Sequence, residues 1–294
     1  MLSQRIASSA AGCMRQWTTG PRASHGALLR SWSDAGSYST AATQPPVFVI
    51  FGASGGIGSA LAQRLAKYPG AALVLVGRDQ AKLDSLQAGL TSRPQGGVST
   101  LVADVTDSKQ VEAAISSAVS NHGPLAAVAN CVGSIVLKAA HQTSDAEFDQ
   151  VLRLNLTSCF NILRPSVKNM MANGGGSVVF CSSAVARHGI PNHEAIAAAK
   201  AGIMGLALSA AATYAPKKIR VNCVAPGLTR TPLAARITGN PASLKASEAM
   251  HALKRVGEAD EVAAALEFLM DPSNSFITGQ CLGVDGGLGS LKPQ

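Results

Sequence analysis

The feature that most constrains the fold is a continuous apolar segment that runs directly into a glycine-rich loop. Residues 47–51 (Val-Phe-Val-Ile-Phe) carry no polar side chain, a pattern typical of a strand covered on both faces. The loop at 52–58 (Gly-Ala-Ser-Gly-Gly-Ile-Gly) leads into a stretch with apolar residues at helical spacing. A strand, a glycine-rich turn and a helix in this order predict the first unit of a parallel α/β sheet.

The same alternation of strand and helix continues to the end of the chain. Further strands are expected at 72–76, 99–103, 125–129, 177–181, 219–224 and 280–284. Helices are expected at 60–66, 79–90, 108–121, 148–171, 193–214 and 258–270. Alternation without hairpin signals predicts a single Rossmann-type, doubly wound parallel sheet of about seven strands with helices on both faces. We expect this α/β domain to span residues 46–294.

The first 45 residues differ in composition from the rest. They contain four arginines, many serines and alanines, and Asp34 as the only carboxylate before Asp79. A basic, serine-rich segment without a continuous apolar core is typical of an organellar transit peptide. We therefore expect residues 1–45 to direct the chain to the mitochondrial matrix, with the plastid stroma as the alternative; a disordered tail without an address is the other interpretation.

Composition excludes several classes of protein. The chain has 294 residues, of which 47% are hydrophobic and only 14% are charged, which suits a large core and an oligomer that hides surface. The longest uncharged helical stretch, 201–215, is shorter than the ~20 residues that cross a bilayer, so no membrane span is expected. No His, Cys or carboxylate spacing suggests a metal, and the six cysteines are expected to be reduced. No basic stripe with aromatic residues suggests nucleic acid.

The glycine-rich loop, taken together with motifs further along the chain, indicates a family. The glycines at 52, 56 and 58 follow a Gly-x-x-x-Gly-x-Gly spacing, and Ser183 lies 13 residues before position 196, which lies four before Lys200. With Pro226-Gly227 and the Asp-Gly-Gly at 285–287, this layout resembles the short-chain dehydrogenase/reductase family over residues 46–289. Its β-ketoacyl carrier reductase type is the most similar in layout.

The resemblance implies a nicotinamide dinucleotide at the glycine-rich loop, with its phosphates on the amides of the helix N-terminus. Asp104 would meet the adenine, and the segment after Pro226 the carboxamide. The expected dinucleotide contacts are Gly52, Ser54, Gly56, Ile57, Gly58, Arg78, Asp104, Val105, Asn130, Gly133, Lys200, Pro226, Gly227 and Thr229. Cys131 and Val132 depart from the Asn-Asn-Ala-Gly that the family has at 130–133.

The end of the second strand favours NADP(H) over NAD(H). An acidic residue there would bond the ribose 2′-hydroxyl of NAD, but this chain has Gly77 followed by Arg78. A guanidinium can pair with a 2′-phosphate, which a carboxylate would repel. A solvated loop arginine is the alternative interpretation of Arg78.

The resemblance also assigns a catalytic set, and one member is missing. Ser183 would orient the substrate oxygen, Lys200 would hold the nicotinamide ribose, and Asn155 would anchor a water in a proton relay. The family has a tyrosine as proton donor four residues before the lysine, but Ile196 stands there. His193 lies one helical turn earlier on the same face and is our candidate for the acid/base, unless it only bonds the backbone or solvent.

Two functions therefore remain in view. The first is an NADP(H)-dependent oxidoreductase for a carbonyl/alcohol pair with an altered proton donor. The second is an inactive dinucleotide-binding protein that serves as a sensor or structural subunit. A variant of the first is a C=C or imine reduction, in which water or Lys200 would complete the proton transfer. A substrate lid is expected at 228–257, where five cations against one carboxylate suggest an anionic small-molecule substrate or merely a solvated face. The family resemblance implies a homodimer or homotetramer, with Ala207, Ala210 and Ala211 expected on an exposed helix face.

Overall fold

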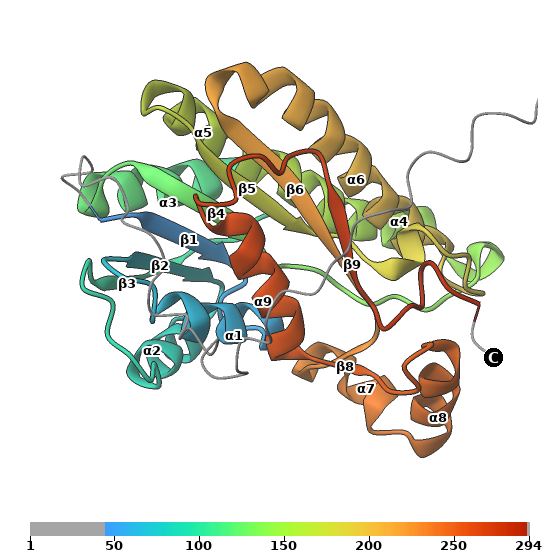
Figure 1. The fold of residues 1–294 in the computed structure, drawn as a ribbon. Helices are drawn as coiled ribbons and strands as arrows, with labels where there is room; N and C mark the ends of the chain where they lie inside the picture. Colours follow the sequence, from blue (N-terminus) through green and yellow to red (C-terminus); the bar gives the residue numbers. More distant parts are fainter. Residues whose placement is uncertain (1–44, 293–294) are drawn as a thin grey trace, which may run out of the picture. The chain divides into compact units, whose positions relative to one another are not determined.

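The computed structural model of the protein describes residues 45–292, which form a seven-stranded sheet between two layers of helices (Figure 1). All neighbouring strands run parallel, in the order β3-β2-β1-β4-β5-β6-β9. The strands are β1 (Val47–Phe51), β2 (Ala72–Gly77), β3 (Val98–Val102), β4 (Leu125–Asn130), β5 (Gly176–Cys181), β6 (Ile219–Pro226) and β9 (Cys281–Val284). The predicted doubly wound sheet of seven strands is confirmed.

Helices cover both faces of this sheet, as the continuous apolar strands require. One layer holds α3 (Ser108–His122), α5 (Ser158–Ala172) and α6 (Glu194–Tyr214), and the other holds α1 (Gly56–Leu65), α2 (Gln80–Ala88) and α9 (Ala259–Met270). Each layer packs on its own apolar core, and each core includes side chains from one face of the central strands. The order in which strands are added reverses its direction between β1 and β4. At this point doubly wound sheets open a crevice at the carboxyl ends of their strands.

The helix expected at 148–171 is longer and is not regular. It starts as α4 (Asp145–Leu152), with a capping box between Ser144 and Glu147, and passes through one π-helical turn (Arg153–Thr157) into α5. The π-turn adds one residue to a helical turn, and Asn155 lies within it. A pattern of apolar residues carries no sign of this shift in backbone hydrogen bonding.

The prediction that three alanines lie on an exposed face of α6 is wrong. Ala207, Ala210 and Ala211 are buried, because the small side chains let α6 pack closely on β6. Leu208, on another side of α6, is 62% exposed. A helix that is apolar on nearly all sides has no stripe from which the buried side can be predicted.

By length and composition alone, residues Glu194–Lys217 form the one described helix that could cross a membrane. This stretch is longer than the 15 uncharged residues noted in the sequence. It packs on the sheet and holds Lys200 in the protein interior, as a core helix of an α/β domain does.

The segment between β6 and α9 forms a small subdomain that the alternation pattern did not predict. It contains β7 (Thr229–Arg230) paired with β8 (Gly257–Glu258), and helices α7 (Ala235–Thr238) and α8 (Pro241–Met250). The predicted transit peptide lies almost entirely outside the described residues.

Candidate active site

The glycine-rich loop leaves the N-terminus of α1 open to a ligand. Gly52 makes the sharp turn with a φ of +76°, and its amide donates to the Val76 carbonyl at 2.9 Å. A Cβ at Gly58 would collide with the Gly52 carbonyl, so only glycine lets the helix start this close to the loop. No side chain caps α1, and its first turn holds no acidic residue. The free amides suit the pyrophosphate of a dinucleotide.

The loop also touches the end of β2, where the identity of the dinucleotide would be determined. A Cβ at Gly77 would lie 3.3 Å from the Ser54 hydroxyl, so the two segments are in contact. Arg78 follows, is exposed, and forms no ion pair within residues 45–292. Its charge contributes to a lowered pKa of Asp104, although the amide and hydroxyl of Thr106, both at 2.8 Å, are the main cause.

Asn130 and Val105 support the crevice rather than face it. The Asn130 side chain accepts from the Val132 amide at 3.0 Å and donates toward Cys159 and Ser158 in the interior. It thereby shapes the turn at 130–133. Val105 is buried, and its carbonyl accepts from the Asn161 side chain at 3.0 Å.

Three predicted catalytic residues lie around the carboxyl ends of β4, β5 and β6. A Cβ at Gly133 would lie 3.1 Å from both Lys200 Nζ and Asn155 Oδ1, which places these two groups side by side. Asn155 Nδ2 donates to the Ser134 hydroxyl at 2.9 Å. Ser183 lies two residues after the end of β5, and its hydroxyl donates to the Pro226 carbonyl at 3.5 Å, next to the segment expected at the nicotinamide.

Lys200 is buried, and no carboxylate pairs with it among residues 45–292. Its ammonium donates to the Cys181 carbonyl at 2.9 Å, and the residue is 6% exposed. Burial lowers the pKa of Lys200, because the charged form loses solvation and no carboxylate lies close enough to compensate. A bound dinucleotide would offer its ribose hydroxyls as additional acceptors.

Ile196 fills the position of the absent tyrosine with apolar packing. It is 5% exposed and belongs to a small cluster on the side of α6 that faces α4. The other members are Val151, Ala195 and Ala199, with Val136, Leu152 and Val185 packed against them. Isoleucine itself carries no group that could donate a proton.

His193 stands at the start of α6 and bonds the backbone. Its Nδ1 lies 2.8 Å from the Pro191 carbonyl, which fixes Nδ1 as the protonated nitrogen and leaves Nε2 as an acceptor. No hydrogen bond links His193 to Ser183, Asn155 or Lys200 in the described structure. Its role as acid/base stays a prediction.

The structure adds contacts that the sequence analysis missed. Thr231 lies against the glycine-rich loop, since a Cβ at Gly56 would be 2.6 Å from its methyl group. Thr229, the threonine named in the prediction, is buried and bonds the Gly227 carbonyl at 3.1 Å. The spacing Pro-Gly-x-x-x-Thr would have pointed to Thr231.

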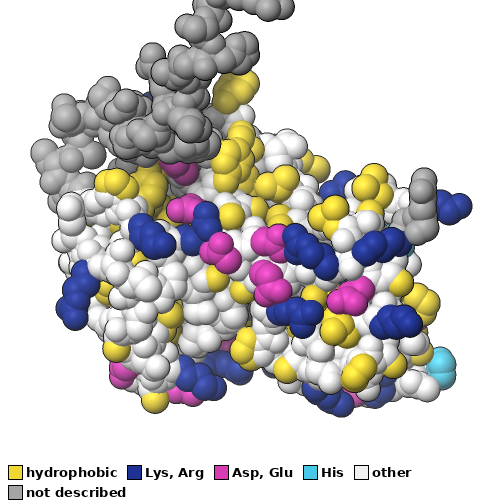
Figure 2. All heavy atoms as spheres, turned by 60° about the horizontal axis from the view of Figure 1, so that its bottom comes forward, with side chains coloured by type: hydrophobic (Ala, Val, Ile, Leu, Met, Phe, Trp, Pro, Cys, Tyr) yellow, Lys and Arg dark blue, Asp and Glu magenta, His cyan; other side chains and the backbone are white. Residues whose placement is uncertain are grey.

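The lid is less basic than its composition suggests. Arg255 pairs with both oxygens of Glu261, at 2.8 and 2.6 Å, and Arg230 pairs with Glu258 at 3.3 Å. Both carboxylates lie just beyond the expected lid. On the face shown in Figure 2, basic and acidic side chains are likewise interspersed.

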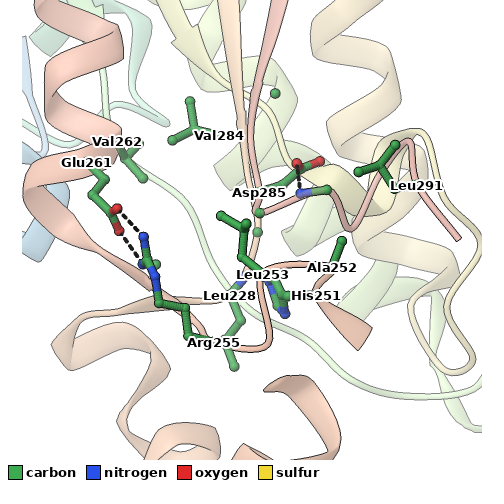
Figure 3. A pocket seen from close by; sticks show the side chains of 15 residues that line it. Leu228, His251, Ala252, Leu253, Arg255, Glu261, Val262, Val284, Asp285 and Leu291 are labelled. Carbon is green, nitrogen blue, oxygen red and sulfur yellow. Dashed lines mark hydrogen bonds and ion pairs between the residues drawn. The ribbon is translucent and has the colours of Figure 1, made fainter. Parts of the chain in front are cut away.

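A cavity of about 370 Å³ meets the expected dinucleotide site at Gly227 and extends away from the predicted catalytic residues (Figure 3). The Arg255–Glu261 pair and the buried His251 border it, and none of the predicted catalytic residues does. Its apolar walls are Leu228, Leu253, Val262, Val284 and Leu291.

Within residues 45–292, no group of three or more His, Cys, Asp or Glu side chains could hold a metal. The residues present do fit a nicotinamide dinucleotide, since the glycine turn and the uncapped helix follow β1, and Lys200 lies beside Gly133 after β4, at the edge where doubly wound sheets bind such ligands. When bound, such a cofactor supplies the hydride.

Comparison with known proteins agrees with this geometry. The family model described as Enoyl-(Acyl carrier protein) reductase matches residues 52–289. The chain is 33% identical over 242 residues to 3-oxoacyl-(acyl-carrier-protein) reductase FabG of Thermotoga maritima, covering 82% of this chain and 97% of that protein. It is 37% identical over 244 residues to cis-4-hydroxycyclohexanecarboxylate dehydrogenase of Sinomonas cyclohexanicum, covering 82% and 95%.

A similar solved structure is a tyrosine-to-phenylalanine variant of ElxO with NADPH bound. It superposes with a TM-score of 0.78 at 28% identity, over 84% of this chain and all of that one. Sequence, fold and site geometry thus lead to the same conclusion: the chain belongs to the short-chain dehydrogenase/reductase family of oxidoreductases.

Proposed function

We propose that this chain is an NADP(H)-dependent reductase of a carbonyl/alcohol pair that works without the family's tyrosine. The observation that carries the proposal is the retained group of Ser183, Asn155 and Lys200 beside an open dinucleotide crevice. A protein that only bound the dinucleotide would need Lys200 but not the other two side chains.

NADP(H) is proposed over NAD(H) because β2 ends without a carboxylate. Gly77 and the exposed Arg78 leave room and positive charge for a 2′-phosphate. The NADPH in the ElxO variant supports the same choice, since that relative binds the phosphorylated dinucleotide.

The proton would come from a group other than position 196. His193 is our candidate, because its Nε2 remains free to exchange a proton while Nδ1 is held by Pro191. Water or Lys200, whose pKa is lowered by burial, would serve a substrate that needs weaker acid assistance.

The packing of Ile196 favours a second function, a dinucleotide-binding protein without turnover. The side chain is integrated into the apolar cluster and leaves no polar group in its place. Loss of general acid catalysis lowers rates by about 10²–10⁴-fold and leaves cofactor affinity intact. Such a protein would act as a sensor or a structural subunit.

Binding and turnover of the full-length chain separate the two functions. We would titrate NADPH and NADH by nicotinamide fluorescence, then follow NADPH oxidation with a panel of ketones and β-keto thioesters. His193→Ala would be compared with His188→Ala, a matched change at an exposed histidine on the preceding loop. Turnover that only His193→Ala abolishes would establish the reductase with His193 as its acid. Tight binding without turnover would favour the second function, and absence of binding would refute both.

We further propose that α5 and α6 form the contact of a homodimer or homotetramer. Phe160 on α5 is 47% exposed and Leu208 on α6 is 62% exposed, and both helices belong to one layer (Figure 1). Light scattering tests this assembly, and a strict monomer would refute it. Arg236 and Lys245, which form no ion pair in the described part of the chain, are proposed to meet an anionic substrate.

Residues 1–45 are proposed to direct the chain to the mitochondrial matrix. Fluorescent-protein fusions with and without this segment test the address, and plastid import would support the alternative.

A further inference from the structure

Two cysteines far apart in the sequence meet beneath the active site. The register of β4 and β5 pairs Asn130 with Phe180, so the next residues, Cys131 and Cys181, lie opposite each other. Both side chains project to the same face of the sheet, since both pack in the core beneath α1 and α9. The two thiols are therefore neighbours across adjacent strands.

Their separation suits a disulfide. Neighbouring strands lie about 4.8 Å apart, and disulfides join Cα atoms about 4.4–6.8 Å apart. In the reduced protein the Cys131 thiol donates a hydrogen bond to the sulfur of Cys181, which lowers the pKa of Cys181 and raises that of Cys131. The positive charge of Lys200 also favours a thiolate on Cys181.

The backbone of the same two residues supports the site. The Cys181 carbonyl is the acceptor that holds Lys200 Nζ at 2.9 Å. The Cys131 amide donates to the Phe51 carbonyl at 2.9 Å, and a Cβ at Gly52 would lie 3.0 Å from the Cys131 carbonyl carbon. Any change in the distance between Cys131 and Cys181 thus acts on both the glycine-rich turn and Lys200.

We propose that Cys131 and Cys181 form a peroxide-sensitive dithiol whose closure to a disulfide weakens dinucleotide binding. The thiolate of Cys181 attacks a peroxide, gains one oxygen as a sulfenic acid, and releases water or an alcohol. The Cys131 thiol then attacks the sulfenic sulfur, forms the S–S bond and expels water. Two thiols lose two electrons and two protons, and the peroxide is reduced by the same two electrons.

A second thiol pair in the domain provides an internal control. Cys223 on β6 and Cys281 on β9 are register partners and lie in the opposite core, beneath α5 and α6. Their separation is equally suitable for a disulfide, but their backbone does not hold Lys200 or the glycine-rich turn. Cysteine proximity alone would make the two pairs equivalent, whereas our proposal assigns the functional effect to the first.

The test treats the full-length reduced chain with hydrogen peroxide. We expect peptide mapping to find a Cys131–Cys181 cross-link with a mass loss of about 2 Da. NADPH affinity, measured by fluorescence, should fall by about tenfold or more because the site groups are displaced, and dithiothreitol should restore it. NADPH present during oxidation should slow the cross-link.

Matched variants decide between the two pairs. After peroxide, Cys131→Ser should keep the NADPH affinity of its own untreated form, while Cys223→Ser should lose affinity as the wild type does. A cross-link only at Cys223–Cys281, or equal loss of affinity in Cys131→Ser, would overturn the proposal. Mass mapping reads the cross-link without turnover or NADPH binding, so failure of the proposed function would leave this result interpretable.

Discussion

The dinucleotide crevice and the hydride-transfer position depend on different parts of the chain. The crevice is formed mainly by backbone: Gly52, Gly58 and the uncapped amides of α1. The predicted hydride-transfer position depends on single side chains, and one of them, Ile196, carries no proton to exchange.

The difference shows how such a protein can change its chemistry without changing its fold. A substitution at Gly58 would disturb the loop, the helix and the sheet together. A substitution at Ile196 exchanges one side chain in a small cluster that already contains apolar neighbours, so the fold accommodates it. The crevice can therefore persist whether or not the chain catalyses a reaction.

Ile196→Tyr is the most direct test of whether position 196 limits catalysis while the dinucleotide crevice stays intact. If the crevice and the remaining side chains are in place, a tyrosine there should raise carbonyl reduction by about 10²–10⁴-fold. The expected change is in kcat with NADPH affinity nearly constant, and steady-state kinetics with binding titrations measure it. Ile196→Phe is the control, since it adds the ring without the hydroxyl. Equal rates in both variants would show that the missing hydroxyl is not what limits turnover.

Gly58→Val tests the backbone side of the contrast. The new side chain would collide with the Gly52 carbonyl, so we expect a loss of about 3 kcal/mol in unfolding free energy and loss of NADPH binding. Urea unfolding and fluorescence titration measure the two effects. Gly205→Ala is the matched control: nothing lies within 4 Å of its Cβ, and a helix gains about 1 kcal/mol from alanine. Similar losses in both variants would contradict the proposed requirement for glycine at 58.

The glycine-rich loop and the predicted catalytic residues also show what the sequence could predict. The strand, glycine turn and helix at 47–65 follow from local residues, because the turn requires the positive φ of Gly52 and the backbone of Gly52 approaches Gly58 closely. Asn155 and Lys200 lie side by side at Gly133, and Ser183 follows β5 next to the Pro226 carbonyl, because parallel strands place their carboxyl ends at one edge. The catalytic roles of these three residues stay predictions.

The remainder depends on tertiary contacts that no local pattern reveals. Arg230 on β7 reaches Glu258 on β8 because these two strands pair, and the buried side of α6 depends on how closely its alanines approach β6. The Cys131–Cys181 pair depends on the register of β4 and β5, which brings together two residues separated by 49 others in the chain. The spacing of the cysteines in the sequence does not indicate that these two are neighbours.

Arg78→Asp changes the charge at the dinucleotide crevice without changing its backbone, and so tests how the crevice selects between NADPH and NADH. A carboxylate would repel the 2′-phosphate, so the ratio of NADPH to NADH affinity should fall by about tenfold or more. Lys67→Asp makes the same charge change at the far end of α1 and should leave the ratio unchanged. An unchanged ratio in Arg78→Asp would identify Arg78 as a solvated loop residue.

The smallest expected effect concerns the segment that links the two regions. Lys138, in the loop after β4, pairs with Glu147 on α4 at 2.7 Å, and this pair with Ser144 lowers the pKa of Glu147 to about 2. Because the folded pKa lies below the ordinary value near 4.5, the pair stabilises the fold above that pH. This contribution should be lost as pH falls toward 2. The melting-temperature difference between wild type and Glu147→Gln should therefore be largest near neutral pH and shrink on acidification. A difference that stays constant from pH 7 to about pH 3 would mean that the ion pair adds nothing beyond the helix cap.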